Sequence, residues 1–205
     1  MIFDLQDMDG ASRYRLLMST VVPRPIAWLS TSDRDGRVNL APFSCFNVMG
    51  SSPAMVAIGI QSHPDGRSKD SCANIRQTGE FVVNLVTRRD GDAMFMTAQD
   101  HEPDVDEAQL VGLATMPSAR VVPPRIASAP CSLECRTFQI VQPGEALTIV
   151  LGEVLAVHVR DDLVLDARRP TLDTPGLGLI GRMEGPGWYT TCEGRLSIPG
   201  GDATV

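Results

Sequence analysis

Two short strand-like runs joined by a polar turn constrain the fold of this 205-residue chain more than any other stretch. Residues 26–31 and 38–46 are mostly apolar, and the turn at 32–37 contains an Asp-Gly pair, which is typical of a β-hairpin. Pro42 lies within the second run. Because proline has no N–H to donate, this run either leaves regular pairing at Pro42 or lies at the edge of a sheet.

The rest of the chain repeats the β pattern and contains only short helices. Strict alternation of strand and helix is absent, so a doubly wound parallel sheet is disfavoured. The sequence therefore predicts a mainly β fold, a closed or split antiparallel barrel with a few short helices, with a bulge or bend at Gly152. The expected further strands are 54–60, 80–86, 131–141 and 146–160. The expected helices are 12–18, a short one within 68–79, 92–98 and a second short helix near Leu110.

Composition narrows the class of protein. Hydrophobic residues make up 43% of the chain, which is enough for one globular domain, and we expect a single domain over 1–205 with its core at about 12–192. No apolar run approaches the ~20 residues of a membrane helix, and the acidic N-terminus has no basic leader, so we expect a cytoplasmic protein. The net charge of −7 argues against a nucleic-acid partner.

The five cysteines do not have the spacing of a metal site. We expect them to be buried, reduced thiols. His101 lies beside several carboxylates, but their spacing does not provide a set of metal ligands either. No metal is therefore predicted.

Short polar side chains are placed along the otherwise apolar hairpin, at Ser30, Thr31, Asn39 and Ser44. A purely structural core would not need them. A flat ligand with polar edge atoms would, because buried ring nitrogens and carbonyls must find hydrogen-bond partners. The hairpin is therefore a candidate ligand-binding wall.

Lys69 is the only lysine among the 18 basic residues, in a chain that otherwise uses arginine. It stands at the expected start of a helix, which Ser68 or Asp70 can cap, and Ser71 adds a hydroxyl. Free backbone N–H groups, the positive end of the helix dipole, an ammonium and a hydroxyl together form a phosphate-binding corner. The alternative is an ordinary capped helix with a surface lysine.

Arg24 lies between Pro23 and Pro25. The two prolines fix the backbone on either side and so set the direction of the guanidinium. The alternative is an exposed arginine in a turn.

Four segments follow one another along the chain: PRPIAW at 23–28, NLAPFS at 39–44, KDS at 69–71 with NI at 74–75, and GEFVVN at 79–84. In this order they resemble the flavin reductase-like domain family, the FMN-binding split barrels that include flavoredoxin. The resemblance covers about residues 12–192 and implies a six-stranded split β-barrel with Greek-key features, a homodimer, and one FMN per subunit near the dimer interface.

The resemblance also implies how the site residues divide the flavin between them. The first strand would line one side of the flavin, the second would meet the edge of the isoalloxazine ring, and the helix start would hold the phosphate. The implied residues are Trp28, Ser30 and Thr31 on the first strand; Asn39, the backbone of Leu40, Ala41 and Phe43 around Pro42, and Ser44 on the second; and Lys69, Asp70 and Ser71 at the phosphate, with Arg24 helping to neutralise it and Asn74 bracing the loop.

The function that this resemblance implies is an NADH- or NADPH-dependent flavin reductase that transfers hydride to flavin N5, with an oxygenase or another electron acceptor as partner. No catalytic side chain is expected, because the flavin supplies the difficult chemistry. One alternative is an FMN-binding electron carrier without its own nicotinamide site. Another, from a different class, is a small barrel that serves as a binding module for nucleic acid or protein, which the negative charge disfavours.

Overall fold

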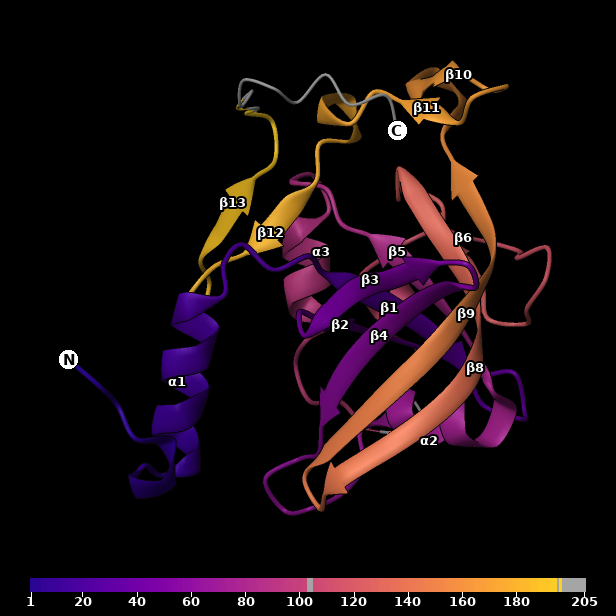
Figure 1. Ribbon diagram of the computed structural model, residues 1–205. Helices are drawn as coiled ribbons and strands as arrows, with labels where there is room; N and C mark the ends of the chain where they lie inside the picture. Colours follow the sequence, from indigo (N-terminus) through magenta and orange to yellow (C-terminus); the bar gives the residue numbers. More distant parts are fainter. Residues whose placement is uncertain (103–104, 195, 197–205) are drawn as a thin grey trace.

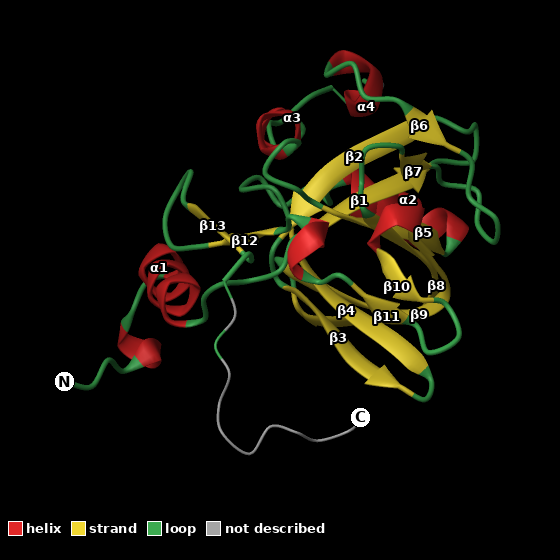
Figure 2. Cartoon of the chain, turned by 90° about the horizontal axis from the view of Figure 1, so that it is seen from above, coloured by secondary structure: helices red, strands yellow, loops and turns green. Residues whose placement is uncertain are grey.

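The computed structural model describes residues 1–102, 105–194 and 196. Its centre is a strongly curved antiparallel sheet of seven strands, in the spatial order β2-β1-β5-β8-β9-β4-β3 (Figures 1 and 2). The strands are β1 (Ala27–Ser32), β2 (Val38–Phe43), β3 (Phe46–Ser51), β4 (Ala54–Gln61), β5 (Glu80–Leu85), β8 (Cys131–Gly144) and β9 (Leu147–Val159).

Short helices and two-stranded ribbons surround the sheet. The α-helices are α1 (Gly10–Thr20), α2 (Asp70–Thr78), α3 (Gly91–Met96) and α4 (Glu107–Leu110), and 3-10 turns occur at Leu5–Asp7, Asp161–Leu163 and Pro175–Leu177. The ribbons pair β6 (Thr115–Met116) with β7 (Arg125–Ile126), β10 (Val164–Asp166) with β11 (Thr171–Leu172), and β12 (Ile180–Arg182) with β13 (Tyr189–Thr191). None of the described helices is long and apolar enough to cross a bilayer.

The two edge strands of the sheet, β2 and β3, are consecutive in sequence. Only Ser44 and Cys45 connect them, so the sheet must curl until its two edges approach each other at this corner. The split β-barrel predicted from the sequence is confirmed, with seven strands in the sheet in place of six. The seventh is β3: the run at 38–46 is not one strand, because the chain turns directly after Phe43.

Hydrophobic side chains fill both faces of the sheet. Inside the curve, Leu29, Ile58 and Phe81 pack with Ile75 of α2. On the other face, Trp28 belongs to a second cluster, to which the segment 86–130 contributes residues of α3 and α4. Adjacent residues of β1 therefore point into opposite clusters, as the two-residue period of a strand requires, and the whole of β1 is buried.

Gly152 lies beside an irregularity in the long β8–β9 hairpin, as expected, but the extra residue is on the partner strand. Thr137 pairs with Gly152 and Gln139 pairs with Leu151, so Phe138 is the bulged residue. The reason for a glycine at 152 is close packing: an added Cβ would lie 2.4 Å from Cζ of Phe81, which is fully buried.

Gly152→Ala should lower the free energy of unfolding by about 1–3 kcal/mol, because the added methyl group overpacks a ring that cannot move into solvent. Urea denaturation measures the effect. Gly144→Ala, in the same hairpin, is the matched control, since its added Cβ meets no atom within 4 Å. Equal denaturation midpoints for the two variants would show that Phe81 has room to move.

Candidate functional site

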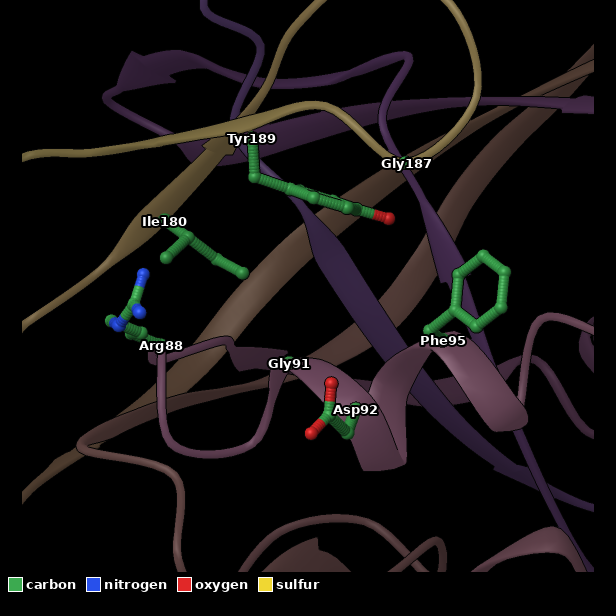
Figure 3. Close-up of a pocket in the computed structure, with 7 residues that line it drawn as sticks. All are labelled: Arg88, Gly91, Asp92, Phe95, Ile180, Gly187 and Tyr189. Carbon is green, nitrogen blue, oxygen red and sulfur yellow. The ribbon is translucent and has the colours of Figure 1, made fainter.

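Three neighbouring cavities share lining residues and form one groove, which begins along the outer edge of β2 and continues to α3 and β13. The first lies between β2, the start of α2 and residues 97–107, and the second shares Pro42, Phe43 and Ala98 with it. The third shares Phe95 and Tyr189 with the second and has a volume of about 450 Å³ (Figure 3). From Asn39 to Phe43, β2 extends about 14 Å at the usual rise of a strand. The groove is therefore long enough for an extended ligand.

The Lys69 end of the groove is the start of α2. Lys69 is the N-cap residue, with φ −63° and ψ 146°, and no side chain caps this helix. The cap expected from Ser68 or Asp70 is thus wrong: the residue in the cap position is a lysine, whose ammonium has no lone pair to accept a hydrogen bond. The first N–H groups of α2 are left without a side-chain acceptor beside the cation.

A carboxylate that the sequence did not single out faces Lys69. Lys69 Nζ lies 2.7 Å from Asp100 Oδ1, and Nδ1 of His63 lies 3.4 Å from the same oxygen. The hydrogen bond from Lys69 lowers the pKa of Asp100. Because the aspartate is largely exposed, this ion pair contributes little to stability, and another anion can replace it.

Four of the expected polar residues meet beneath this end of the groove. Thr31, Asn39, Ser71 and Asn74 are all buried. Asn74 Nδ2 donates to Thr31 Oγ1 at 3.1 Å, and the side-chain amide of Asn39 lies 2.8 Å from Ser71 Oγ. Asn39 and Ser71 line the first cavity. Thr31 and Asn74 do not line it and instead fix α2 against the hairpin.

Glu107 is a site residue that sequence reasoning missed. It belongs to α4 and is 6% exposed, and its Oε2 accepts a hydrogen bond from the backbone N–H of Leu40 at 2.9 Å. With the amide of Asn39 oriented to satisfy its neighbours, Asn39 donates to Glu107 Oε1 at 3.2 Å. Burial raises the pKa of Glu107, although the Leu40 hydrogen bond opposes the shift.

The backbone of β2 presents fewer donors to the groove than the resemblance implied. The N–H of Leu40 is taken by Glu107, and Pro42 has none. Strand residues alternate in the direction of their hydrogen bonds, so the N–H groups of Ala41 and Phe43 point to β1. The outward-facing backbone groups that remain along this edge are carbonyls.

Arg24 lines none of the three cavities of the groove, and its expected part in holding the phosphate is not supported. It is 6% exposed, and its guanidinium donates to the carbonyls of Met18 at 2.6 Å, Val21 at 3.0 Å and Met183 at 3.1 Å. Its Nε lies 3.4 Å from Ser44 Oγ. The residue therefore ties the end of α1 and the chain after β12 to the corner at Ser44.

Trp28 and Ser30 are fully buried and do not line the groove. Trp28 Nε1 donates to Thr97 Oγ1 at 2.9 Å, and Asn84 Nδ2 donates to Ser30 Oγ at 3.2 Å. Ser30 in turn donates to the carbonyl of Pro124. These side chains fasten the segment 86–130, which forms one wall of the groove, to the sheet.

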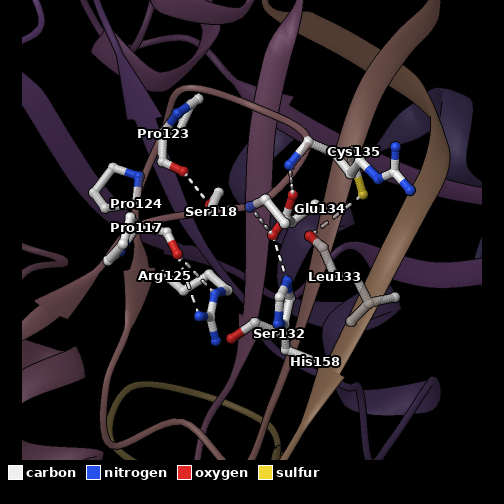
Figure 4. Close-up of polar contacts among 12 residues, drawn as sticks. Pro117, Ser118, Pro123, Pro124, Arg125, Ser132, Leu133, Glu134, Cys135 and His158 are labelled. Atoms are coloured by element: carbon white, nitrogen blue, oxygen red, sulfur yellow. Dashed lines mark hydrogen bonds and ion pairs between the residues drawn. The ribbon is translucent and has the colours of Figure 1, made fainter.

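A buried carboxylate holds the same segment further along (Figure 4). Glu134, which is 0% exposed, accepts from the backbone N–H groups of Ala119 at 2.8 Å and Arg120 at 2.6 Å, and it pairs with His158. Although burial opposes ionisation, these hydrogen bonds together lower the pKa of Glu134. His158, on β9, thus helps to hold this carboxylate in place.

The cysteines are free thiols, but only three of the five are buried, while Cys45 and Cys192 are exposed. Burial raises the pKa of Cys131 to about 11 and that of Cys135 to about 12, so both stay protonated at neutral pH. No group of three or more His, Cys, Asp or Glu side chains among the described residues is arranged to hold a metal ion.

The chain is similar in sequence and in fold to known proteins. The sequence profile described as "Flavin reductase like domain" matches residues 18–173. An uncharacterized protein of Deinococcus radiodurans is 46% identical over 192 residues, which are 92% of this chain and 84% of that protein.

Three solved structures resemble the chain over nearly its whole length. Pseudomonas fluorescens 2-nitrobenzoate 2-nitroreductase NbaA is 30% identical with a TM-score of 0.88, covering 97% of this chain and 95% of that one. Nitrilotriacetate monooxygenase component B from Bacillus cereus is 25% identical with a TM-score of 0.89, covering 97% and 98%. A split-barrel protein from Shewanella frigidimarina NCIMB 400, 20% identical with a TM-score of 0.81 and covering 97% and 98%, shows the fold alone.

Proposed function

Because the chain belongs to the flavin reductase-like domain family, we propose that it binds FMN in the groove along β2 and transfers hydride from NADH or NADPH to flavin N5. The observation that carries this proposal is the uncapped start of α2 beside Lys69, at one end of a groove of suitable length.

The residues at this end fit a phosphate group. The first N–H groups of α2 have no side-chain acceptor, and both the helix dipole and the Lys69 ammonium favour an anion there. The partner of Lys69 in the structure is itself an anion, the carboxylate of Asp100. A phosphate would take the place of that carboxylate. A single phosphate-binding position of this kind favours FMN, which has a single phosphate.

Further along the groove, the walls suit a flat ring. Pro42 and Phe43 form one side of the middle cavity, and Tyr14, Phe95 and Tyr189 add aromatic surface. When bound, the flavin supplies the hydride chemistry at N5. The chain's own residues bind and orient the ring and exclude water from it. For this reason no protein acid or base is assigned a catalytic role.

The similar proteins support a redox role with a separate electron acceptor. One is named as a nitroreductase and another as a component of a monooxygenase. An oxygenase or a small oxidised molecule is therefore the proposed recipient of the electrons. The cytoplasmic location expected from the sequence stays a prediction.

The proposal also includes a homodimer. The helix α1 stands away from the sheet in both views, and none of its residues is buried (Figures 1 and 2). Between α1 and the β3–β4–β9 side of the sheet lies a cavity of about 540 Å³, and Leu17, Val21 and Met49, which line it, are exposed. A second copy of the chain would cover this apolar surface. Sedimentation velocity of the full chain tests this: a single-chain species at micromolar concentration would contradict it.

The activity is tested by stopped-flow mixing of the FMN-loaded chain with NADH and with NADPH under anaerobic conditions. We expect at least one of them to remove the visible absorbance of oxidised flavin within roughly seconds, the timescale of ordinary turnover. Reduction by dithionite with no reaction toward either nicotinamide would favour the alternative of an electron carrier. A chain that does not bind FMN would overturn the proposal altogether.

A further inference from the structure

The first cavity of the groove, at the start of α2, is lined by titratable side chains of both signs. They are His63, Lys69, Asp70, Asp100, His101 and Glu107. With both histidines neutral and every carboxyl group ionised, one ammonium faces three carboxylates, a net charge of −2. A phosphate monoester adds about −1.5 to −2 at neutral pH. Binding of such an anion here therefore requires positive charge beyond that of Lys69.

One carboxylate of this cavity is shared by two basic side chains. Lys69 Nζ lies 2.7 Å from Asp100 Oδ1, and Nδ1 of His63 lies 3.4 Å from the same oxygen. The side chain of Asp100 is 67% exposed, whereas that of His63 is only 11% exposed. The backbone of His63 is also held, because its N–H donates to the carbonyl of Arg67 at 2.8 Å. The imidazole is therefore a fixed partner for a carboxylate that is free to turn.

Two other basic side chains near this carboxylate already have partners of their own. Nε2 of His101 lies 3.1 Å from the carbonyl oxygen of Met96, and Arg67 Nε donates to Asp65 at 2.8 Å. When a phosphate takes Lys69, His63 is the basic group that already lies beside Asp100. Because histidine changes its charge near neutral pH, it can supply the missing positive charge by taking up a proton.

Resting on the proposed function, we propose that His63 is a positioning residue that takes up one proton from solvent when FMN binds. Lys69 exchanges the carboxylate of Asp100 for the phosphate, and the imidazolium of His63 then holds Asp100. The added proton offsets part of the negative charge that the phosphate brings into the cavity. The affinity for FMN should therefore rise as the pH falls, because protons and flavin bind together.

The charged and titratable groups around His63 come from its own loop and from three neighbouring elements. They are Asp65 and Arg67 on the loop, Lys69 and Asp70 at the start of α2, Asp100 and His101 after α3, and Glu107 on α4. Glu107 is also able to hold an extra proton, because burial raises its pKa. His63 differs from it by contacting the carboxylate that Lys69 releases. Removal of the His63 imidazole alone therefore tests the assignment.

Calorimetric titration of the flavin-stripped full chain with FMN, in PIPES and in imidazole buffer at about pH 7, counts the protons, because the two buffers release them with different heats. We expect the wild type to take up roughly 0.5 proton or more per FMN. His63→Gln and Asp100→Asn should each remove most of this uptake, and the double variant should remove no more than either. A purely structural role for His63 would leave the count unchanged.

Two controls accompany these variants. His101→Gln changes the other histidine that lines the cavity, which faces a carbonyl instead of a carboxylate, and should keep the proton uptake. Riboflavin, which has no phosphate, should bind to the wild type without proton uptake. In addition, the tightening of FMN binding by Asp100→Asn should be at least threefold larger at about pH 8 than at about pH 6, where the imidazolium already neutralises the carboxylate.

Proton uptake that is absent in the wild type, or that persists in His63→Gln, would overturn the inference. The titration of the FMN phosphate itself is common to all variants, so it cancels in the comparison with His63→Gln. A chain that binds FMN without taking up a proton refutes only the role of His63. A chain that binds no FMN refutes the proposed function, and the inference falls with it.

Discussion

Lys69→Ala should raise the dissociation constant for FMN about 5- to 150-fold, equivalent to about 1–3 kcal/mol. The reason is the loss of a charge-assisted contact to the phosphate at the start of α2, where no side chain caps the helix. Quenching of flavin fluorescence during titration of the flavin-stripped chain measures the constant.

Three comparisons separate this effect from general damage to the site. Riboflavin has no phosphate, so its affinity should be the same in Lys69→Ala and in the wild type. Arg67→Ala removes a neighbouring exposed cation that pairs with Asp65, and it should change FMN binding little. Asp100→Asn should tighten FMN binding, because it removes the carboxylate that competes for Lys69. Unchanged FMN affinity in Lys69→Ala would show that the phosphate is held elsewhere.

Glu107→Leu should lower the free energy of unfolding by about 1–3 kcal/mol, because it leaves the backbone N–H of Leu40 buried without an acceptor. It should also weaken FMN binding, since the edge of β2 is the wall of the groove. Glu107→Gln is the matched control: the amide oxygen can still accept from Leu40. Urea denaturation of both variants measures the difference, and equal losses in the two would contradict the role given to the hydrogen bond.

The stabilities of the wild type and of Glu107→Gln should also depend differently on pH. Burial raises the pKa of Glu107 in the folded chain above its unfolded value. Below the unfolded pKa, the carboxyl is protonated in both states, and this group takes nothing from the free energy of unfolding of the wild type. As the pH rises through the folded pKa, the free energy of unfolding falls. Glu107→Gln cannot ionise, so its stability relative to the wild type should increase across this range. A difference in the free energy of unfolding between the two proteins that stays constant with pH would contradict the raised pKa of Glu107.

Local pattern was enough to predict the architecture. Alternating apolar residues predicted the long strands. Pro42 predicted either a break in pairing or an edge strand, because it has no N–H to donate, and β2 is an edge strand. The sequence pattern did not predict that the run at 38–46 divides into β2 and β3. The break at Ser44–Cys45 contains no glycine and follows Pro42 by only two residues.

The site was predictable only where its residues are neighbours in sequence or belong to the hairpin. Lys69 and Ser71 lie together at the start of α2, and Asn39 meets them from β2. Asp100 and Glu107 were missed because their partners lie 31 and 67 residues away, and no local signal connects them.

Arg24 shows a second limit of prediction from sequence, which concerns side-chain contacts. Two prolines fix its backbone, but the destination of its guanidinium is set by carbonyls of Met18, Val21 and Met183, and the last of these is 159 residues away. A motif can locate such a residue in the fold without revealing which groups it contacts. The same holds for Trp28, whose indole meets Thr97 inside the protein and not the groove.

The central claim is that the groove from Lys69 to Ser44 holds one phosphorylated flavin, and calorimetric titration of the flavin-stripped wild-type chain with FMN and with riboflavin tests it most directly. The account predicts one FMN per chain and an affinity at least tenfold higher for FMN than for riboflavin, the factor that corresponds to about 1.4 kcal/mol at the phosphate corner. Equal affinities for the two flavins, or no uptake of FMN, would contradict it.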